Sequence, residues 1–352
     1  MNFQINIAGR KIGKNYPPFI IAEMSGNHNQ SIDRALEIVE QAAKCGVDAI
    51  KIQTYTADTM TLDINEGEFF IEDPNSLWKG KSLYKLYEEA YTPWEWHKAI
   101  FDKAAELGII AFSSPFDASA VDFLEELDCP CYKIASFENT DIPLIKKVAA
   151  TGKPVIISTG MATIEEIADA VQAAKDAGCK SLILLKCTSA YPAKASDANI
   201  STIIDMKKRF NLPIGLSDHT SGIGVAIASC AIGAEVIEKH FTLNREDGGV
   251  DSAFSLEPHE MKSLVEESRR SWEAVGKVAY GPSENENKSK IFRRSIYVVK
   301  DINKGEVFST DNIRTIRPGL GMLPKYYESV IGKKSSLSLK KGKPLAAEDI
   351  LD

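Results

Sequence analysis

The 352-residue sequence has no long apolar run, and this absence narrows the classes of protein to which it can belong. A membrane-spanning helix needs roughly 18 to 20 consecutive apolar residues, and no segment of the sequence reaches that length. The N-terminal stretch places no apolar core behind a basic patch, so we expect no signal peptide. We therefore expect a cytoplasmic protein with no membrane association.

Basic clusters interleaved with aromatic residues are also missing. The formal net charge is −7, with 49 acidic residues against 42 lysines and arginines. Proteins that bind nucleic acid neutralise its phosphates with a basic surface. Nucleic acid is therefore not expected as a partner.

Cysteine is scarce, and its spacing is typical of neither a zinc site nor a disulfide framework. The CxC motif at 129–131 has no partner motif. We expect neither a helix N-terminus nor a histidine beside Cys187, which argues against a nucleophile. We interpret the cysteines as small buried residues in a reducing compartment. The six cysteines are Cys45, Cys129, Cys131, Cys179, Cys187 and Cys230.

Short apolar runs recur along the first 241 residues. Most are continuous rather than alternating, which is typical of strands buried on both faces of a parallel sheet. Capped helical patterns at 31–46, 93–108 and 163–178 lie between them, and a further helix is predicted at 259–276. The eight runs are 19–25, 49–55, 109–115, 131–137, 154–160, 181–188, 213–219 and 235–241.

Eightfold strand–helix alternation predicts an α/β protein, a (β/α)8 TIM barrel, over residues 1–279. A doubly wound open sheet is the rival, but it usually carries a glycine-rich first turn, which is absent here. A polar linker is predicted at 280–290 and a small β-rich domain at 291–352, which is expected to dock on the barrel or on a second subunit. The interval 56–92 is too long for a plain connection and is expected to act as a lid or a substrate-selecting element.

Lysines and hydroxyls gather at the predicted strand ends. The C-terminal ends of barrel strands face the active site, and compact positive charge with hydroxyl donors suits a phosphate-bearing ligand. This set comprises Lys51, Lys133, Ser136, Ser158, Ser189 and Ser217.

Histidines mark another corner of the predicted rim. His219 and His240 end adjacent strands, and neutral imidazoles placed in this way can share one metal ion. A hydrogen-bonded core histidine is the alternative for each. His28 fits either a substrate contact or hydrogen bonds that organise its loop, whereas His97 and His259 are predicted to be solvated on helices.

Ordered motifs at these strand ends resemble those of the sialic acid synthase family. The C-terminal stretches 293–306 and 315–322 resemble its antifreeze-like (SAF) domain. Within the family, MSGNHN and the aromatic insertion 73–97 look most like pseudaminic acid synthases. The motifs are IAEMSGNHNQS (21–31), KIQTYTADT (51–59), FSSPFD (112–117), YKIASFE (132–138), ISTGMAT (157–163), KCTSAYPA (186–193), GLSDHT (215–220) and EKHFTL (238–243).

The resemblance implies a transferase that condenses phosphoenolpyruvate with the open-chain form of 2,4-diacetamido-2,4,6-trideoxy-β-L-altropyranose, forming pseudaminic acid and phosphate by C–O cleavage. It implies that Glu23 is an acid/base group and that His219 and His240 bind a divalent ion (Mn²⁺, Mg²⁺ or Co²⁺). It implies phosphoenolpyruvate contacts from Lys51, Ser114, Lys133, Ser136, Ser158, Ser189 and Ser217. It implies sugar contacts from Asn27, Gln53, Tyr55, Glu138, Tyr191, Asp251 and Arg317.

Arg317 matches a family arginine that reaches a neighbouring subunit's active site, so the resemblance also implies a domain-swapped homodimer. The product would enter a cell-surface glycan or flagellin glycosylation. Ala135 and Phe137 stand where the family commonly has glycines, which is expected to reshape the sugar pocket.

Other functions remain open at the level of the sequence. N-acetylneuraminate and legionaminate synthases share the family motifs. A non-catalytic sugar-binding protein and an aldolase that uses a Schiff-base lysine are the alternatives from other classes.

Overall fold

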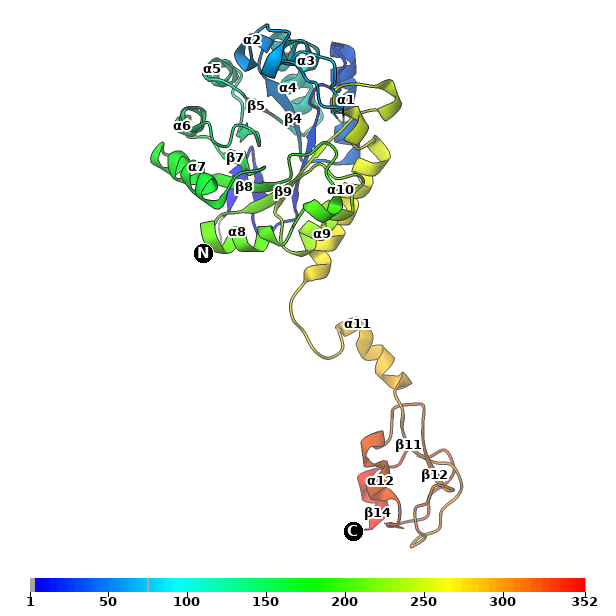
Figure 1. The fold of residues 1–352 in the computed structure, drawn as a ribbon. Coiled ribbons are helices and arrows are strands. Elements are labelled where there is room, and N and C mark those ends of the chain that lie inside the picture. The colour runs from blue at the N-terminus through cyan, green and yellow to red at the C-terminus, as the bar shows by residue number, and fades with distance from the viewer. Residues whose placement is uncertain (1–3, 75, 352) are drawn as a thin grey trace. The chain divides into compact units, whose positions relative to one another are not determined.

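The computed structural model describes residues 4–74 and 76–351 (Figure 1). The chain divides into two compact units, and the boundary falls after Gly276. The relative placement of the two units is not defined, so each is described by itself. Among the described residues, no helix is long and apolar enough to cross a membrane.

The first unit is a closed parallel barrel, which confirms the predicted TIM barrel and excludes the open sheet. Around the barrel the strand order is β10-β3-β4-β5-β6-β7-β8-β9. Every residue of β3, β7, β9 and β10 is buried, as expected for strands covered on both faces. The strands are β3 (Phe19–Glu23), β4 (Ala49–Thr54), β5 (Ile110–Pro115), β6 (Tyr132–Ile134), β7 (Val155–Ser158), β8 (Leu182–Cys187), β9 (Ile214–Asp218) and β10 (Val236–His240).

Helices cover the outside of the barrel (Figure 1). Helix α1 begins after Ser31, whose side chain accepts a hydrogen bond from the Arg34 amide, and ends at Gly46 in the left-handed conformation, with φ +81°. A capping box between Thr163 and Glu166 starts α7. The helices are α1 (Ile32–Cys45), α4 (His97–Glu106), α5 (Ala118–Glu126), α6 (Ile142–Ala150), α7 (Ile164–Asp176), α8 (Thr202–Phe210), α9 (Gly224–Ala231) and α10 (Pro258–Val275).

Three parts of the first unit go beyond the prediction. A hairpin of β1 (Ile5–Ile7) and β2 (Arg10–Ile12) precedes the barrel, and its three-residue strands are too short to produce a readable pattern. The interval 56–92 folds into α2 (Ala57–Met60), a 3₁₀ turn and α3 (Leu83–Ala90). The helix predicted from residue 93 begins as a separate 3₁₀ turn, Trp94–Trp96, ahead of α4.

The second unit holds small antiparallel sheets around its own core, as predicted for a β-rich module. It contains α11 (Glu284–Asn287), β11 (Ser295–Val298), β12 (Ile313–Ile316), α12 (Tyr327–Val330), β13 (Lys334–Ser335) and β14 (Ile350–Leu351). Strand β11 pairs with β12, and β13 pairs with β14. The buried core comprises Ile296, Val298, Ile302, Phe308, Ile313, Val330, Leu339 and Leu345.

Candidate active site

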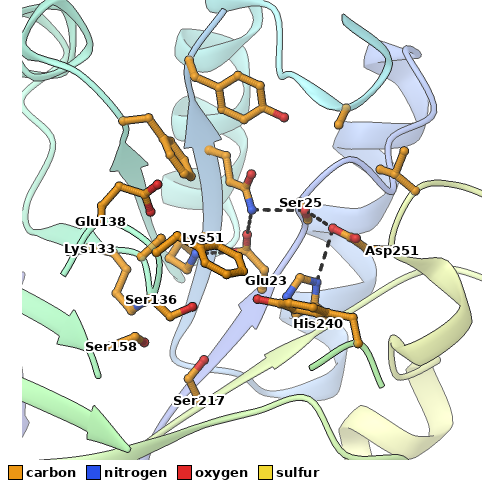
Figure 2. Close-up of a pocket in the computed structure, with 18 of the residues that line it drawn as sticks. Glu23, Ser25, Lys51, Lys133, Ser136, Glu138, Ser158, Ser217, His240 and Asp251 are labelled. Carbon is orange, nitrogen blue, oxygen red and sulfur yellow. Dashed lines mark hydrogen bonds and ion pairs between the residues drawn. The ribbon is translucent and has the colours of Figure 1, made fainter. Parts of the chain in front are cut away.

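A pocket of about 250 Å³ lies at the C-terminal ends of the barrel strands (Figure 2). Parallel strands bring their carboxyl ends to one rim, so residues far apart in sequence meet there. The structure brings 13 of the predicted site residues together in this pocket. They are Glu23, Lys51, Gln53, Tyr55, Lys133, Ser136, Glu138, Ser158, Tyr191, Ser217, His219, His240 and Asp251.

The other predicted residues lie elsewhere. Ser114 accepts a hydrogen bond from Lys51 Nζ at 3.2 Å, and Ser189 donates to Ser136 Oγ at 2.8 Å, so both support pocket residues. The Asn27 amide donates to the Phe241 carbonyl and to Ser255 Oγ, both at 2.9 Å, and ties two loops together.

Arg317 belongs to the second unit. Its position relative to the pocket is therefore not described.

Buried charges form the floor of the pocket. Lys51 Nζ lies 2.7 Å from Glu23 Oε2 and 3.6 Å from Glu238 Oε1, and Lys133 Nζ lies 3.8 Å from the same Glu238 oxygen. Strand register creates this cluster, because Glu23 on β3 stands opposite Lys51 on β4 and His240 on β10. Sequence reasoning placed Glu238 at the same strand end as His240 but gave it no role in the site, although it precedes His240 by two residues and therefore shares its face of the strand.

The two floor carboxylates differ in proton affinity. Burial raises the pKa of Glu23 above its ordinary value, against the opposing effect of Lys51. Burial also acts on Glu238, but the charges of Lys133 and Lys51 outweigh it and lower the pKa of that carboxyl. Glu23 is thus the floor carboxyl suited to proton transfer, whereas Glu238 stays ionised beside the lysines.

His219 and His240 form one corner, with ring centroids 5.3 Å apart. His219 Nδ1 donates to the Thr188 carbonyl at 2.9 Å, so Nε2 is the ring nitrogen left for another partner. Burial acts to lower the pKa of His219, but its contacts with Cys187 and the Thr188 carbonyl outweigh burial and raise that pKa. Burial and the neighbouring His219 lower the pKa of His240 well below its ordinary value, so its imidazole is neutral. His240 Nδ1 is buried without a hydrogen-bond partner in the described residues, and Asp251 Oδ2 lies 3.8 Å from it. These donors fit a divalent metal ion.

Cys187 corrects one expectation. Its Sγ lies 3.9 Å from His219 Nδ1, so the interpretation that no histidine lies beside this cysteine is wrong. The two residues are 32 positions apart, and only the pairing of β8 with β9 brings them together. All six cysteines are free and buried, as predicted.

Hydroxyls cover the side of the pocket around β6, β7 and β9. Ser158 Oγ is buried and has no hydrogen-bond partner among the described residues, so it is available to a ligand oxygen. Gly160 lets the backbone pass close to this group, because a Cβ there would lie 2.7 Å from Ser136 Cβ and 2.8 Å from Ser189 Oγ. The serine side is thus built for a polar ligand in close contact.

The opposite side of the pocket is apolar and was not predicted residue by residue. Met60, Trp78, Leu86 and Tyr87 line it, and all four come from the 56–92 interval or its helices. The Tyr87 ring meets Tyr55, with ring centroids 5.8 Å apart. The aromatic content of the interval was the available signal, but its contact with the pocket depends on the fold.

Polar residues link the metal corner to the acid/base group. Gln53 Nε2 donates to Glu23 Oε1 at 2.8 Å and to Ser25 Oγ at 3.1 Å. Ser25 in turn donates to Asp251 (Figure 2). Across the pocket, burial raises the pKa of Glu138 to about 7.

The remaining histidines lie outside the pocket lining. The buried His28 accepts a hydrogen bond from the Gln30 amide at 3.2 Å, which matches the loop-organising alternative. The prediction of a solvated His97 is wrong: it is fully buried, with Nε2 2.8 Å from Thr54 Oγ1, because the first turn of α4 packs on β4. His259 is exposed, as predicted, and stands near Glu257 and Glu260 at the start of α10.

These three residues at the start of α10 could hold a cation by distance alone. Glu257 and Glu260 already cap the helix and pair with Arg245, so the fold accounts for their positions.

Comparison with known proteins agrees with this geometry. Residues 38–280 match the NeuB family model and residues 293–351 match the SAF domain model. The pseudaminic acid synthase of Campylobacter jejuni is 44% identical over 94% of this chain and 96% of its own length. That of Helicobacter pylori is 44% identical over 95% of this chain and 98% of its own length.

A solved structure shows the same architecture. The N-acetylneuraminic acid synthetase of Leptospira borgpetersenii superposes with a TM-score of 0.74 at 33% identity, over 82% of this chain and 95% of that chain. The family match covers more than half of the sequence and includes every barrel strand except β3. The chain therefore belongs to the NeuB family, the sialic acid synthases, and carries a C-terminal SAF domain.

Proposed function

We propose that the protein synthesises pseudaminic acid by condensing phosphoenolpyruvate with open-chain 2,4-diacetamido-2,4,6-trideoxy-L-altrose. The observation that carries this proposal is the pocket itself, where buried lysines and serine hydroxyls line one cavity with a neutral histidine and a carboxyl of raised pKa. The 44% identity to two pseudaminic acid synthases over almost the whole chain supports this acceptor sugar.

Phosphoenolpyruvate would occupy the lysine and serine side. Lys51 and Lys133 supply buried positive charge for its phosphate and carboxylate, and Ser136, Ser158 and Ser217 supply hydroxyl donors. Glu238 holds both lysines in place by ion pairs of 3.6 and 3.8 Å. Ser114 and Ser189 would not touch phosphoenolpyruvate themselves. They hydrogen-bond to Lys51 and Ser136, which would contact it.

His219 and His240 would hold a divalent ion (Mn²⁺, Mg²⁺ or Co²⁺), which when bound would supply Lewis-acid polarisation of the sugar aldehyde. The Thr188 carbonyl orients His219 so that Nε2 faces its ligand. Asp251 lies beside His240 and accepts a hydrogen bond from Ser25, and its carboxylate would contact the sugar at this corner.

Glu23 would serve the proton transfers. The enol carbon of phosphoenolpyruvate attacks the aldehyde carbon, and the aldehyde oxygen takes up a proton to become a hydroxyl. Water then adds to the phosphate-bearing carbon and loses a proton, and the tetrahedral intermediate releases phosphate by C–O cleavage to leave the 2-keto acid. Gln53 orients Glu23 through its 2.8 Å hydrogen bond, so the carboxyl stays aimed at these carbons.

The sugar would lie against Tyr55, Glu138 and Tyr191 on one side and the aromatic interval on the other. An apolar wall suits the C6 methyl group and the two acetamido methyl groups of this acceptor. A fully hydroxylated sugar has hydroxyls at these positions. Phe137, in place of a family glycine, lines the same pocket.

We further propose a domain-swapped homodimer in the cytoplasm. In this arrangement the barrel (1–279), the linker (280–290) and the SAF domain (291–352) are separate parts of each chain, and Arg317 contacts the sugar in the partner's barrel. The barrel unit carries a net charge of −13 and the second unit +6, so a barrel and a second unit from different chains attract each other.

The deciding experiment is phosphate release measured by a coupled assay with a panel of acceptors. The protein should prefer the 2,4-diacetamido-trideoxy-altrose over N-acetylmannosamine and over the legionaminic acid precursor, and a chelator should abolish turnover. Preference for N-acetylmannosamine would assign an N-acetylneuraminate synthase instead. Trapping of pyruvate on the protein by borohydride would indicate a Schiff-base aldolase, and binding without turnover would indicate a sugar-binding protein.

A further inference from the structure

Trp78 and Val250 border two cavities at once. One is the active-site pocket, and the other is a separate cavity of about 450 Å³. Residues from three segments line the second cavity: 26–30 after β3, 77–89 of the long interval, and 249–253 after β10. The side chains of Trp78 and Val250 therefore form the wall between the two spaces.

The indole of Trp78 is held in place. Its Nε1 donates to the Val250 carbonyl at 2.9 Å, and its ring lies 6.2 Å from the Tyr191 ring, between centroids. The three segments also pack closely beside the indole, because a Cβ on Gly26 would lie 2.4 Å from Val250 Cγ2 and 3.1 Å from the Ala90 Cα. The Trp78 side chain thus stands between the two cavities in a crowded and hydrogen-bonded position.

Under the proposed function, the acceptor would run from the strand ends toward the apolar lining that includes Trp78. The reacting carbon of the sugar is C1, and the groups that act on it, Glu23, His219 and His240, lie at the strand ends. Trp78 belongs to the interval that supplies the apolar side with Met60 and Tyr87. C4 and its acetamido group are three bonds beyond C1, so an acceptor bound in this direction would present them to the apolar lining.

We propose that Trp78 is a specificity-determining residue that limits the length of the acyl group on the C4 nitrogen of the acceptor. This inference rests on the proposed function. The indole face packs against the acetamido methyl, and the second cavity is the space that a longer acyl chain enters when the ring is removed. A methyl in contact with a fixed aromatic face leaves no volume for another methylene.

The test uses acceptors that carry acetyl, propanoyl or butanoyl on the C4 nitrogen and acetyl on the C2 nitrogen. Phosphate release gives kcat/KM for the full-length protein and for Trp78→Ala. The wild-type protein should lose about tenfold per added methylene, and Trp78→Ala should raise the butanoyl-to-acetyl ratio by about tenfold or more, since the two cavities then join.

Leu77→Ala is the matched control, because Leu77 lines the second cavity but not the active-site pocket. This change leaves Trp78 and Val250, the wall between the cavities, in place. It should keep the wild-type ratio. Trp78→Phe retains a ring and should stay close to the wild-type preference, whereas Trp78→Leu should be intermediate and serves in place of alanine should that variant not fold.

An unchanged chain-length ratio in both Trp78→Ala and Trp78→Leu would overturn the inference. Its failure is distinct from failure of the proposed function. The function is tested by turnover of the acetyl acceptor by the wild-type protein, and the inference by the ratio between variants.

Discussion

The two units of the chain handle charge in opposite ways. The barrel unit has 27 lysines and arginines against 40 acidic residues, and it buries several of them, including Lys51, Lys133, Glu23 and Glu238. The second unit has 15 lysines and arginines against 9 acidic residues, and Asp349 is the one buried carboxylate in its described part.

From this difference we expect the chemistry to lie in the barrel unit. Burying an ionised group costs free energy unless the group is paired. We therefore expect the buried lysines and carboxylates of the pocket floor to bind a ligand or to transfer protons to it. The second unit instead has a compact apolar core with surface charge, which is typical of a module that binds through its exterior.

The largest effect is expected at the metal corner of the barrel. Replacing both His219 and His240 by alanine should remove divalent-ion binding and lower phosphate release by about 1000-fold or more, because the aldehyde loses its electrophilic activation. Titration of Mn²⁺ followed by electron paramagnetic resonance gives a readout independent of turnover. His259→Ala, at an exposed histidine, should leave both readouts unchanged. Unchanged turnover in the double variant would disprove the metal assignment.

A second experiment separates the barrel from the second unit. A chain with His240→Ala and a chain with Arg317→Ala, each nearly inactive, should recover about a quarter of wild-type activity when co-expressed and allowed to form mixed dimers at random. Half of the dimers are mixed, and each of these has one intact site when Arg317 acts across the dimer. If activity does not recover, Arg317 does not act in the partner's site.

Buried ion pairs provide a stability comparison. Lys239 Nζ and Asp218 Oδ2 are 2.8 Å apart with both side chains buried, whereas Lys343, the partner of Asp349, is partly exposed. Lys239→Met leaves Asp218 unpaired and should lower the unfolding free energy of the barrel by about 3–5 kcal/mol. Lys343→Met should cost the second unit less, about 1–2 kcal/mol, because Asp349 keeps the hydrogen bond from the Ala346 amide.

Separate signals follow the two units during urea unfolding. All four tryptophans lie before residue 277, so tryptophan fluorescence reports the barrel, and hydrogen exchange of β11 amides reports the second unit. Equal losses in the two variants would contradict the proposed difference in charge burial.

Acid stability is a further difference between the units, since all five histidines lie in the barrel unit. Burial lowers the pKa of both His28 and His97 to about 4. Between pH 6.5 and 4 the unfolded chain binds protons that the folded barrel does not, so barrel stability falls as the pH falls through this window, by up to about 3 kcal/mol per histidine.

His97→Gln isolates the contribution of one histidine. Its barrel should lose less stability than the wild-type barrel between pH 6.5 and 5, and the second unit should change equally in both proteins. Urea midpoints from fluorescence measure the difference. Parallel slopes for the two proteins would show that His97 is not held neutral by burial.

Much of the fold followed from local patterns. Continuous apolar runs placed all eight barrel strands, and capping residues such as Ser31 and Thr163 placed the starts of helices. These features are readable because strand and helix periodicity depend on neighbours in the chain. The polar strand ends were equally readable, because parallel strands carry their C-terminal residues to one rim.

Contacts between distant segments were not readable. His97 and His259 both begin helical patterns, yet one is buried against Thr54 and the other is exposed. Cys187 and His219 meet through the pairing of two strands. These contacts depend on which helix face packs against the barrel and on strand register. Neither can be read from the residues adjacent in the sequence.

The sequence by itself therefore determined the barrel and the chemical groups on its rim, including both lysines, the histidine pair and Glu23. Tertiary structure alone decided which of the two floor carboxyls, Glu23 and Glu238, has the raised pKa, and it placed Trp78 in the pocket lining. The physical reason is that proton affinity and pocket size depend on burial and on atoms from distant segments, whereas strand ends and caps depend on adjacent residues.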